Sequence, residues 1–261
     1  MEIVTLFALI VIHELGHVSA ARYFGWRMTE IELLPFGGVA KTDEWGTVSS
    51  RDELIVAIAG PAYNGMMIVF GAVCYVFGWW TAEWAQFFVT ANLWLAGFNL
   101  LPVYPLDGGR IVQAFLSYTL PYRTCLTSSL FISLVLSVGM LLGSLFPLLY
   151  GQPLMFNVGI IAVFLFVSNV LLWRQKNYQF MRFLMQRQID EHTVEKPVTS
   201  VLAMPDDSVL GTIKKWRKEA YNIIVVHDDN GNVLRVLSEQ WLLNHFLSGS
   251  SPRGKLGDFL D

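Results

Sequence analysis

Three long stretches without a charged side chain dominate this sequence. Residues 54–82, 84–106 and 124–173 contain no Asp, Glu, Lys or Arg. Charged residues make up only 15% of the chain, whereas an ordinary soluble domain has about 25%. Twelve of the 18 Lys and Arg residues follow residue 173. The sequence therefore predicts a membrane-embedded domain followed by a soluble tail.

Five windows are long and apolar enough to cross a membrane, because a spanning helix needs about 20 apolar residues. They are residues 3–24, 54–79, 84–119, 126–149 and 154–173. Pro102 and Pro105 interrupt the third window, which predicts one discontinuous helix. Backbone that is not helical is tolerated at membrane depth only where protein buries it or where it lines a polar cavity. We therefore expect this break to lie beside a functional site.

Basic residues predict the orientation of the chain in the membrane. Lys and Arg follow the first, third and last windows, whereas the loops at 80–83 and 150–153 contain none. Under the positive-inside rule this pattern predicts an N-terminus outside and a cytoplasmic C-terminal tail. The first window has no basic segment before it, so we expect it to be a retained helix and not a cleaved signal peptide.

The remaining segments predict smaller elements. Residues 28–50 alternate between apolar and polar and contain a Pro-Phe-Gly-Gly turn, which favours a β-hairpin at the cytoplasmic interface over a plain loop. The pattern at residues 174–197 is typical of an amphipathic linker. Residues 198–261 predict a small α/β domain with a helix at 208–219, a strand at 222–226, a second short strand and a helix at 238–247. The predicted domains are thus 1–173, 174–197 and 198–261.

The first window carries three ionisable residues, His13, Glu14 and His17. Positions i and i+4 share one face of a helix, so the two imidazoles can bind one metal ion. This is the H-E-x-x-H pattern, in which two histidines bind zinc and the carboxylate accepts a proton from the attacking water. The alternative is a pair of hydrogen-bonded structural histidines. Because each ionisable group is costly at membrane depth, three within five residues favour the metal site.

Two histidines leave a catalytic zinc ion one protein ligand short. Asp107 is the only acidic residue between Glu83 and the tail, and it directly follows the predicted break. It could also be the N-cap of the next helix, a role compatible with metal binding. Counted along helices from the basic loops, His13 and Asp107 both fall at the cytoplasmic side of the bilayer. We therefore predict Asp107 as the third ligand.

Three motifs together resemble the signature of the site-2 proteases, which are intramembrane zinc metalloproteases. They are HELGH at 13–17, AGPAYN at 59–64 and NLLPVYPLDGG at 99–109. The resemblance implies a polytopic α-helical membrane enzyme in which His13, His17 and Asp107 bind zinc. It implies Glu14 as the general base. Asn64, Asn99 and Pro105 match motif positions where they would orient substrate or the oxyanion, although helix packing is the alternative role.

The tail resembles a single cystathionine-beta-synthase (CBS) domain in its segments at 201–213, 221–233 and 238–246. That resemblance implies self-association through the tail and binding of ATP or another adenine nucleotide. The pair Arg235 and Val236 departs from the glycine expected after the second strand. A protease core with such a tail is similar to the sporulation members of the family. Those members have a further hydrophobic span before HELGH, whereas twelve residues precede His13 here.

The sporulation members of the family release a sigma factor from its membrane-tethering pro-sequence. The resemblance thus implies a membrane-tethered pro-sigma factor as substrate, inhibitory membrane proteins as partners and a location in the membrane around the forespore. Anti-sigma factors are the alternative substrates. A metal-binding receptor or transporter without catalytic activity is the alternative class.

Two expectations concern what the chain lacks. The net charge of -3, with acidic residues mixed among the basic ones, argues against a nucleic-acid partner. Cys74 and Cys125 have neither disulfide nor metal-ligand spacing, so we expect them to be packing residues.

Overall fold

The computed structural model describes residues 2–34, 37–42, 44–151, 153, 155–189, 196–248 and 254–259. The chain divides into two compact units. The first unit comprises Met1–Ala114 and Leu130–Leu171, and the second comprises Phe115–Ser129 and Leu172–Asp261.

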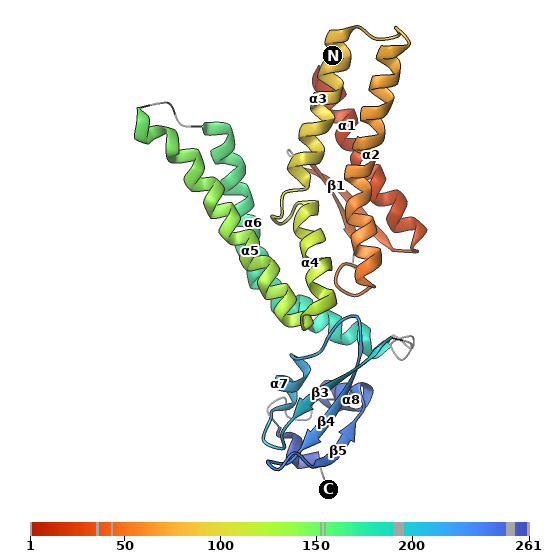
Figure 1. The fold of residues 1–261 in the computed structure, drawn as a ribbon, viewed down its shortest axis with the longest axis vertical. Coiled ribbons are helices and arrows are strands. Elements are labelled where there is room, and N and C mark those ends of the chain that lie inside the picture. The colour runs from red at the N-terminus through yellow and green to blue at the C-terminus, as the bar shows by residue number, and fades with distance from the viewer. Residues whose placement is uncertain are drawn as a thin grey trace. The chain divides into compact units, whose positions relative to one another are not determined.

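Long helices make up most of the chain (Figure 1). They are α1 (Glu2–Tyr23), α2 (Ser50–Val76), α3 (Ala82–Asn99), α4 (Asp107–Thr119), α5 (Tyr122–Leu145) and α6 (Phe156–Ile189), with the 3-10 helix η1 (Phe146–Tyr150) after α5. Four helical segments are long and apolar enough to cross a membrane: Glu2–Tyr23, Ser50–Val76, Tyr122–Tyr150 and Phe156–Ile189. Large apolar side chains on these helices are exposed, as lipid-facing helices require. These features indicate a multi-pass membrane protein.

The first two helices pack closely in the first unit, and α3 lies against α2 (Figure 1). A Cβ atom on Gly16 of α1 would lie 2.7 Å from the carbonyl oxygen of Ala59 in α2. A Cβ atom on Gly71 of α2 would lie 2.9 Å from the ring of Phe88 in α3. A side chain at Gly16 would therefore push against the backbone of α2, and one at Gly71 would push against the Phe88 ring.

The third predicted window is indeed interrupted, and it forms two separate helices. Helix α3 ends at Asn99 and α4 begins at Asp107. The peptide bond between Tyr104 and Pro105 in the connection is cis. A Cβ atom on Gly108 would overlap the carbonyl oxygen of Leu100, so the start of α4 packs directly on the end of α3. The connection at 100–106 is thus a compact turn between two helices.

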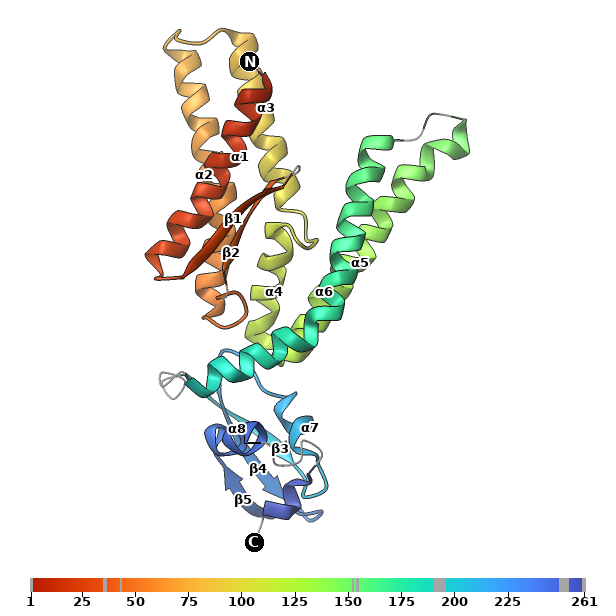
Figure 2. The ribbon, with the colours of Figure 1, turned by 180° about the vertical axis from the view of Figure 1, so that it is seen from behind.

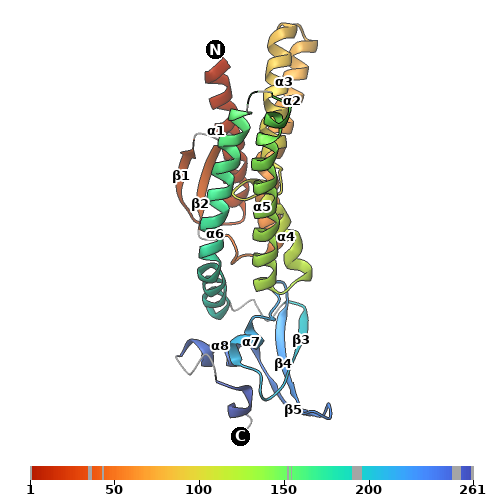
Figure 3. The same cartoon turned by 90° about the vertical axis from the view of Figure 1, so that its left-hand side faces the viewer.

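The segment after α1 forms an antiparallel hairpin of β1 (Met28–Leu34) and β2 (Gly37–Thr42). Ile31 pairs with Ala40 and Leu34 with Gly37. The hairpin lies beside α1 (Figures 2 and 3). The predicted hairpin is therefore confirmed, and the alternative of a plain loop is wrong. The position of the hairpin at a membrane interface stays a prediction. Pro35 and Phe36 of the expected turn lie outside the described residues.

Helix α6 continues past the last predicted span. Its 34 residues run without interruption from Phe156 to Ile189. Most of the predicted linker is therefore the C-terminal part of this helix, and residues 190–195 lie outside the described part of the chain.

The C-terminal part of the second unit contains a three-stranded sheet. Its elements are β3 (Val198–Ala203), α7 (Val209–Ile213), β4 (Tyr221–His227), β5 (Val233–Leu237), α8 (Glu239–Leu247) and η3 (Leu256–Phe259). The strand order is β3-β4-β5, with β3 parallel and β5 antiparallel to β4. Trp216, Ile224 and Leu243 are fully buried in its core. The predicted strands and the last helix are present, and the CBS resemblance stays a prediction.

The helix predicted at 208–219 is wrong in its length, because α7 ends at Ile213. The side chain of Asn222 accepts a hydrogen bond from the N–H of Arg217 at 2.9 Å and donates to the Arg217 carbonyl at 3.1 Å. The N–H and the carbonyl of Arg217 therefore form their hydrogen bonds without a helix. The spacing of apolar residues in this segment could not indicate these bonds. Sequence reasoning also missed strand β3.

Candidate active site

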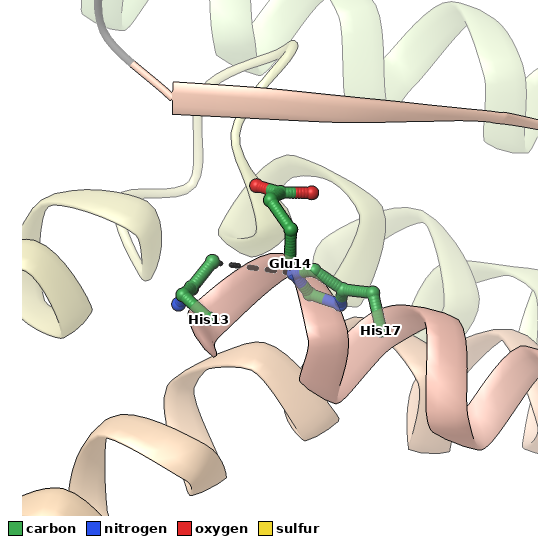
Figure 4. A group of neighbouring side chains, drawn as sticks. All are labelled: His13, Glu14 and His17. Carbon is green, nitrogen blue, oxygen red and sulfur yellow. Dashed lines mark hydrogen bonds between the residues drawn. The ribbon is translucent and has the colours of Figure 1, made fainter. Parts of the chain in front are cut away.

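Helix α1 carries the three residues of the H-E-x-x-H pattern near its middle. His13, Glu14 and His17 are 2%, 7% and 8% exposed. One ligand atom from each lies within 4.8 Å of the ligand atoms of the other two. Figure 4 shows the side chains of His13 and Glu14 leaving neighbouring positions of this helix and that of His17 leaving the next turn. The structure therefore brings the predicted ligands and the predicted base into one cluster.

Asp107 joins this cluster from the first turn of α4. Its Oδ2 atom lies 3.2 Å from Nε2 of His13 and 3.2 Å from Nε2 of His17. The two Nε2 atoms are also 3.2 Å apart. Three potential ligand atoms thus form a nearly equilateral triangle, which we call the donor triangle.

The size of the donor triangle fits a zinc ion. Zinc binds histidine nitrogen and carboxylate oxygen at about 2.0–2.1 Å in tetrahedral geometry, which separates neighbouring ligand atoms by about 3.3 Å. The edges of 3.2 Å match one face of such a tetrahedron. Two imidazoles and one carboxylate are also a ligand set found in catalytic zinc sites.

The backbone of α2 orients His17. Its Nδ1 atom lies 2.8 Å from the carbonyl oxygen of Val56. Since a carbonyl oxygen can only accept, Nδ1 carries the hydrogen, and in the neutral imidazole Nε2 then presents a lone pair to the donor triangle. Such a hydrogen bond fixes both the tautomer and the ring orientation of a metal-binding histidine.

A chain of two buried amides orients His13. Asn92 Nδ2 donates to the carbonyl oxygen of Phe88 at 2.9 Å. Asn92 Oδ1 accepts from Asn64 Nδ2 at 2.9 Å, which leaves Asn64 Oδ1 facing His13 Nδ1 at 2.5 Å. Because the Phe88 carbonyl fixes the direction of every bond, His13 Nδ1 must donate. Helices α2 and α3 thus set the tautomer of a residue on α1.

With both imidazoles neutral, the donor triangle favours a positive charge at its centre. Both Nε2 atoms direct lone pairs towards each other and towards the Asp107 carboxylate at 3.2 Å. Three electron pairs at this spacing repel one another in a site shielded from water. A divalent cation among them removes this repulsion and satisfies all three groups at once.

Gly60 of α2 lies directly against the imidazoles. A Cβ atom at this position would overlap Nε2 of His17 and lie 2.8 Å from Cε1 of His13. Only glycine therefore leaves both rings in place, which explains in steric terms why the AGPAYN motif has glycine at this position.

The other predicted site residues lie outside the donor triangle. Asn64 is fully buried and contacts His13 and Asn92, so it lies behind the donor triangle. Asn99 donates to the carbonyl oxygen of Leu95 in its own helix, at 3.0 Å, and Pro105 lies in the connection before Asp107. Sequence reasoning missed Asn92, although an amide within a charge-free apolar stretch was an available signal.

Comparison with known proteins shows which family the chain resembles. The model of Peptidase family M50 matches residues 1–83 and 78–142. Stage IV sporulation protein FB of Bacillus subtilis is 29% identical over 98% of this chain and 87% of its own length. A zinc metalloprotease of Methanocaldococcus jannaschii is 37% identical over 63% of this chain and 46% of its own length.

A solved structure is similar as well. The site-2 protease from Methanocaldococcus jannaschii matches 64% of this chain and 75% of its own with a TM-score of 0.52 and 31% identity. The prediction of a metalloprotease is confirmed over that of a receptor or transporter, because the relatives are named zinc metalloproteases. The motifs, the donor triangle and these matches agree: the chain belongs to Peptidase family M50, as a metallopeptidase of the site-2 protease type.

Proposed function

We propose that this protein is an intramembrane zinc endopeptidase that cleaves a membrane-tethered protein near the cytoplasmic face. The donor triangle carries the proposal, because its edges of 3.2 Å fit a zinc ion held by His13, His17 and Asp107. Zinc, when bound, polarises a carbonyl group and makes water more acidic.

Glu14 is the proposed general base. Its carboxylate belongs to the same cluster as the two imidazoles and is almost completely buried. In this position it accepts a proton from the attacking water and returns that proton to the leaving amine. Burial limits competing water, which keeps the carboxylate effective as a proton acceptor. Asn64 and Asn92 hold the His13 ring and leave the lone pair of its Nε2 atom available.

We further propose a sporulation sigma-factor precursor as the substrate. The match to a sporulation protein over 98% of the chain supports this, because it includes the tail as well as the protease core. The proposal includes a cytoplasmic C-terminus, a location around the forespore, self-association through the tail and inhibition by other membrane proteins. Nucleotide binding by the tail stays a prediction from the CBS resemblance.

A co-expression assay tests the function. A tagged, membrane-tethered sigma-factor precursor is produced in bacterial membranes with the wild type or with Glu14→Gln, which keeps the volume of the side chain and removes the base. Product with the wild type alone supports both the reaction and the role of Glu14. A purified wild type without zinc would contradict the metal site. A zinc-containing wild type that cleaves an anti-sigma factor and leaves the precursor intact would contradict the proposed substrate alone.

A further inference from the structure

The connection between α3 and α4 contains a peptide backbone that two other helices hold. The N–H of Tyr104 donates to Oγ of Ser133 in α5 at 2.6 Å. The carbonyl oxygen of the same residue accepts from Nδ2 of Asn169 in α6 at 2.7 Å. Both helices belong to the first unit at these positions. One residue of the break is thus bonded on both sides by side chains far away in the sequence.

The two side chains also bond each other. Ser133 Oγ donates to Asn169 Oδ1 at 2.5 Å, while the second hydrogen of Asn169 Nδ2 bonds the carbonyl oxygen of Leu165 at 2.8 Å. Ser133 is fully buried and Asn169 is 1% exposed. The hydroxyl accepts one bond and donates one, and the amide donates both of its hydrogens. We call Ser133 and Asn169 the loop clamp.

The loop clamp satisfies a physical requirement of the break. Non-helical backbone at membrane depth has no water to bond, so each free N–H or carbonyl costs several kcal/mol. Pro102 and Pro105 on either side of Tyr104 have no N–H to contribute to a helix. The clamp therefore replaces, from α5 and α6, the bonds that a continuous helix would have made at Tyr104.

Asp107 depends on the position of this backbone. Leu106 donates to the carbonyl oxygen of Val103 at 3.0 Å, and Gly109 donates to that of Leu106 at 3.1 Å. A Cβ atom on Gly109 would lie only 2.8 Å from the backbone nitrogen of Tyr104, so the first turn of α4 packs directly on the clamped residue. A shift of Tyr104 would move Asp107 with it.

We propose that Ser133 and Asn169 are positioning residues for the third metal ligand, Asp107. Neither side chain is assigned to the donor triangle, and they act through Tyr104. The inference rests on the proposed function, in that it takes Asp107 as a zinc ligand. Its consequence is that two helices which supply no ligand control how tightly the site holds zinc.

A nearby serine provides the control for a purely structural role. Ser137 lies one turn further along α5 and is fully buried, like Ser133. Its hydroxyl donates to the carbonyl oxygen of Leu134 in its own helix at 2.9 Å. Ser137→Ala therefore removes a buried hydroxyl from the same helix without touching the Tyr104 backbone.

The test measures zinc affinity of the purified full chain by competition with a chelator, and the visible absorption spectrum of the cobalt-substituted protein. We expect Ser133→Ala to lower zinc affinity about 10-fold and Asn169→Leu up to about 100-fold, the range typical of groups that orient metal ligands. Both variants should also change the cobalt bands. Ser137→Ala should match the wild type, and Ser133→Thr, which keeps the hydroxyl, should restore most of the affinity.

The outcomes separate this inference from the proposed function. A wild type that binds no zinc contradicts the proposed function. A wild type that binds zinc, with unchanged affinity and spectrum in Ser133→Ala and Asn169→Leu, overturns the loop clamp. An equal loss in Ser137→Ala would also overturn it, since burial alone would then explain the effect. If Asn169→Leu does not fold, Ser133→Ala decides, because it removes fewer atoms and still cuts both bonds of the hydroxyl.

Discussion

His13 and Asp107 meet with Nε2 3.2 Å from Oδ2, although 94 residues separate them in the chain. Helix α1 supplies one and the first turn of α4 supplies the other. Neither helix contains a complete ligand set among these residues. Zinc binding should therefore report on the whole arrangement of the first unit, and not on the H-E-x-x-H helix alone.

Asp107→Asn should abolish tight zinc binding while the protein still folds. The amide keeps the shape of the side chain but removes the negative charge opposite two imidazoles. We expect zinc affinity to fall more than about 100-fold, beyond the loss typical of an outer partner of a ligand. Metal content after dialysis against a weak chelator measures this. Glu83→Gln at the exposed start of α3 is the matched control, and full zinc retention by Asp107→Asn would contradict the assigned ligand.

Asn92→Leu should weaken zinc binding without touching the donor triangle. The substitution leaves Asn64 Nδ2 without its acceptor, so the Asn64 amide no longer has a fixed direction and His13 loses its preferred tautomer. We expect about a 10-fold loss in zinc affinity and a loss of stability of about 1–3 kcal/mol. Thr90→Val, on the exposed side of the same helix, should leave both unchanged. Equal zinc affinity in Asn92→Leu and the wild type would show that the amide chain does not orient His13.

Gly60→Ala should remove proteolysis, because the added methyl group would overlap Nε2 of His17. The ring must move, and the donor triangle opens. A Cβ atom on Gly65 of the same helix would have no atom within 4 Å apart from the neighbouring backbone of its own helix. Since alanine is favoured over glycine inside a helix by about 0.5–1 kcal/mol, Gly65→Ala should be active and no less stable. Cleavage and zinc content of the two variants test this, and an active Gly60→Ala would mean that the helices can separate.

Glu239→Ala should destabilise the second unit. Its carboxylate is 1% exposed, bonds the guanidinium of Arg187 and accepts from the backbone N–H of Asn222 at 2.6 Å. Removing one partner of a buried ion pair typically costs about 3–5 kcal/mol, because the other charge remains buried. Limited proteolysis should therefore cut the tail of this variant faster. Asp206→Ala breaks an exposed ion pair with Lys255, so the protease should cut this control at the wild-type rate. Equally fast cutting of both variants would show that the buried ion pair of Glu239 is not the cause.

Much of the site could be predicted from local chemistry. His13, Glu14 and His17 stand out because ionisable residues are costly in an apolar stretch, and Asp107 stands out as the lone acid between Glu83 and the tail. The break at Pro102 and Pro105 was predictable because proline cannot donate to a helix. These features depend on residue type alone, so a sequence displays them directly.

Other features depend on which segments meet in space. Asn92 and Asn169 look alike in sequence, as asparagines surrounded by apolar residues of a helix, but one bonds Asn64 and the other bonds the Tyr104 backbone. Nothing in their neighbours encodes those partners. The number of spans is similarly difficult, because α3 contains Glu83 and several amides and falls outside the four strongly apolar segments. The early end of α7 depends on Asn222, a residue on the next strand.

The two imidazoles of the donor triangle differ in how strongly a substitution at a partner residue would disturb their orientation. His17 is oriented by the main-chain oxygen of Val56, which every amino acid at that position would also supply. His13 relies on the side chains of Asn64 and Asn92, which few substitutions can imitate. Substitutions at position 56 would therefore keep the hydrogen bond to His17. Substitution of either Asn64 or Asn92 alone would break the hydrogen bonds that orient His13. The orientation of His17 is therefore insensitive to the residue type at its partner position, whereas the orientation of His13 depends on two specific side chains.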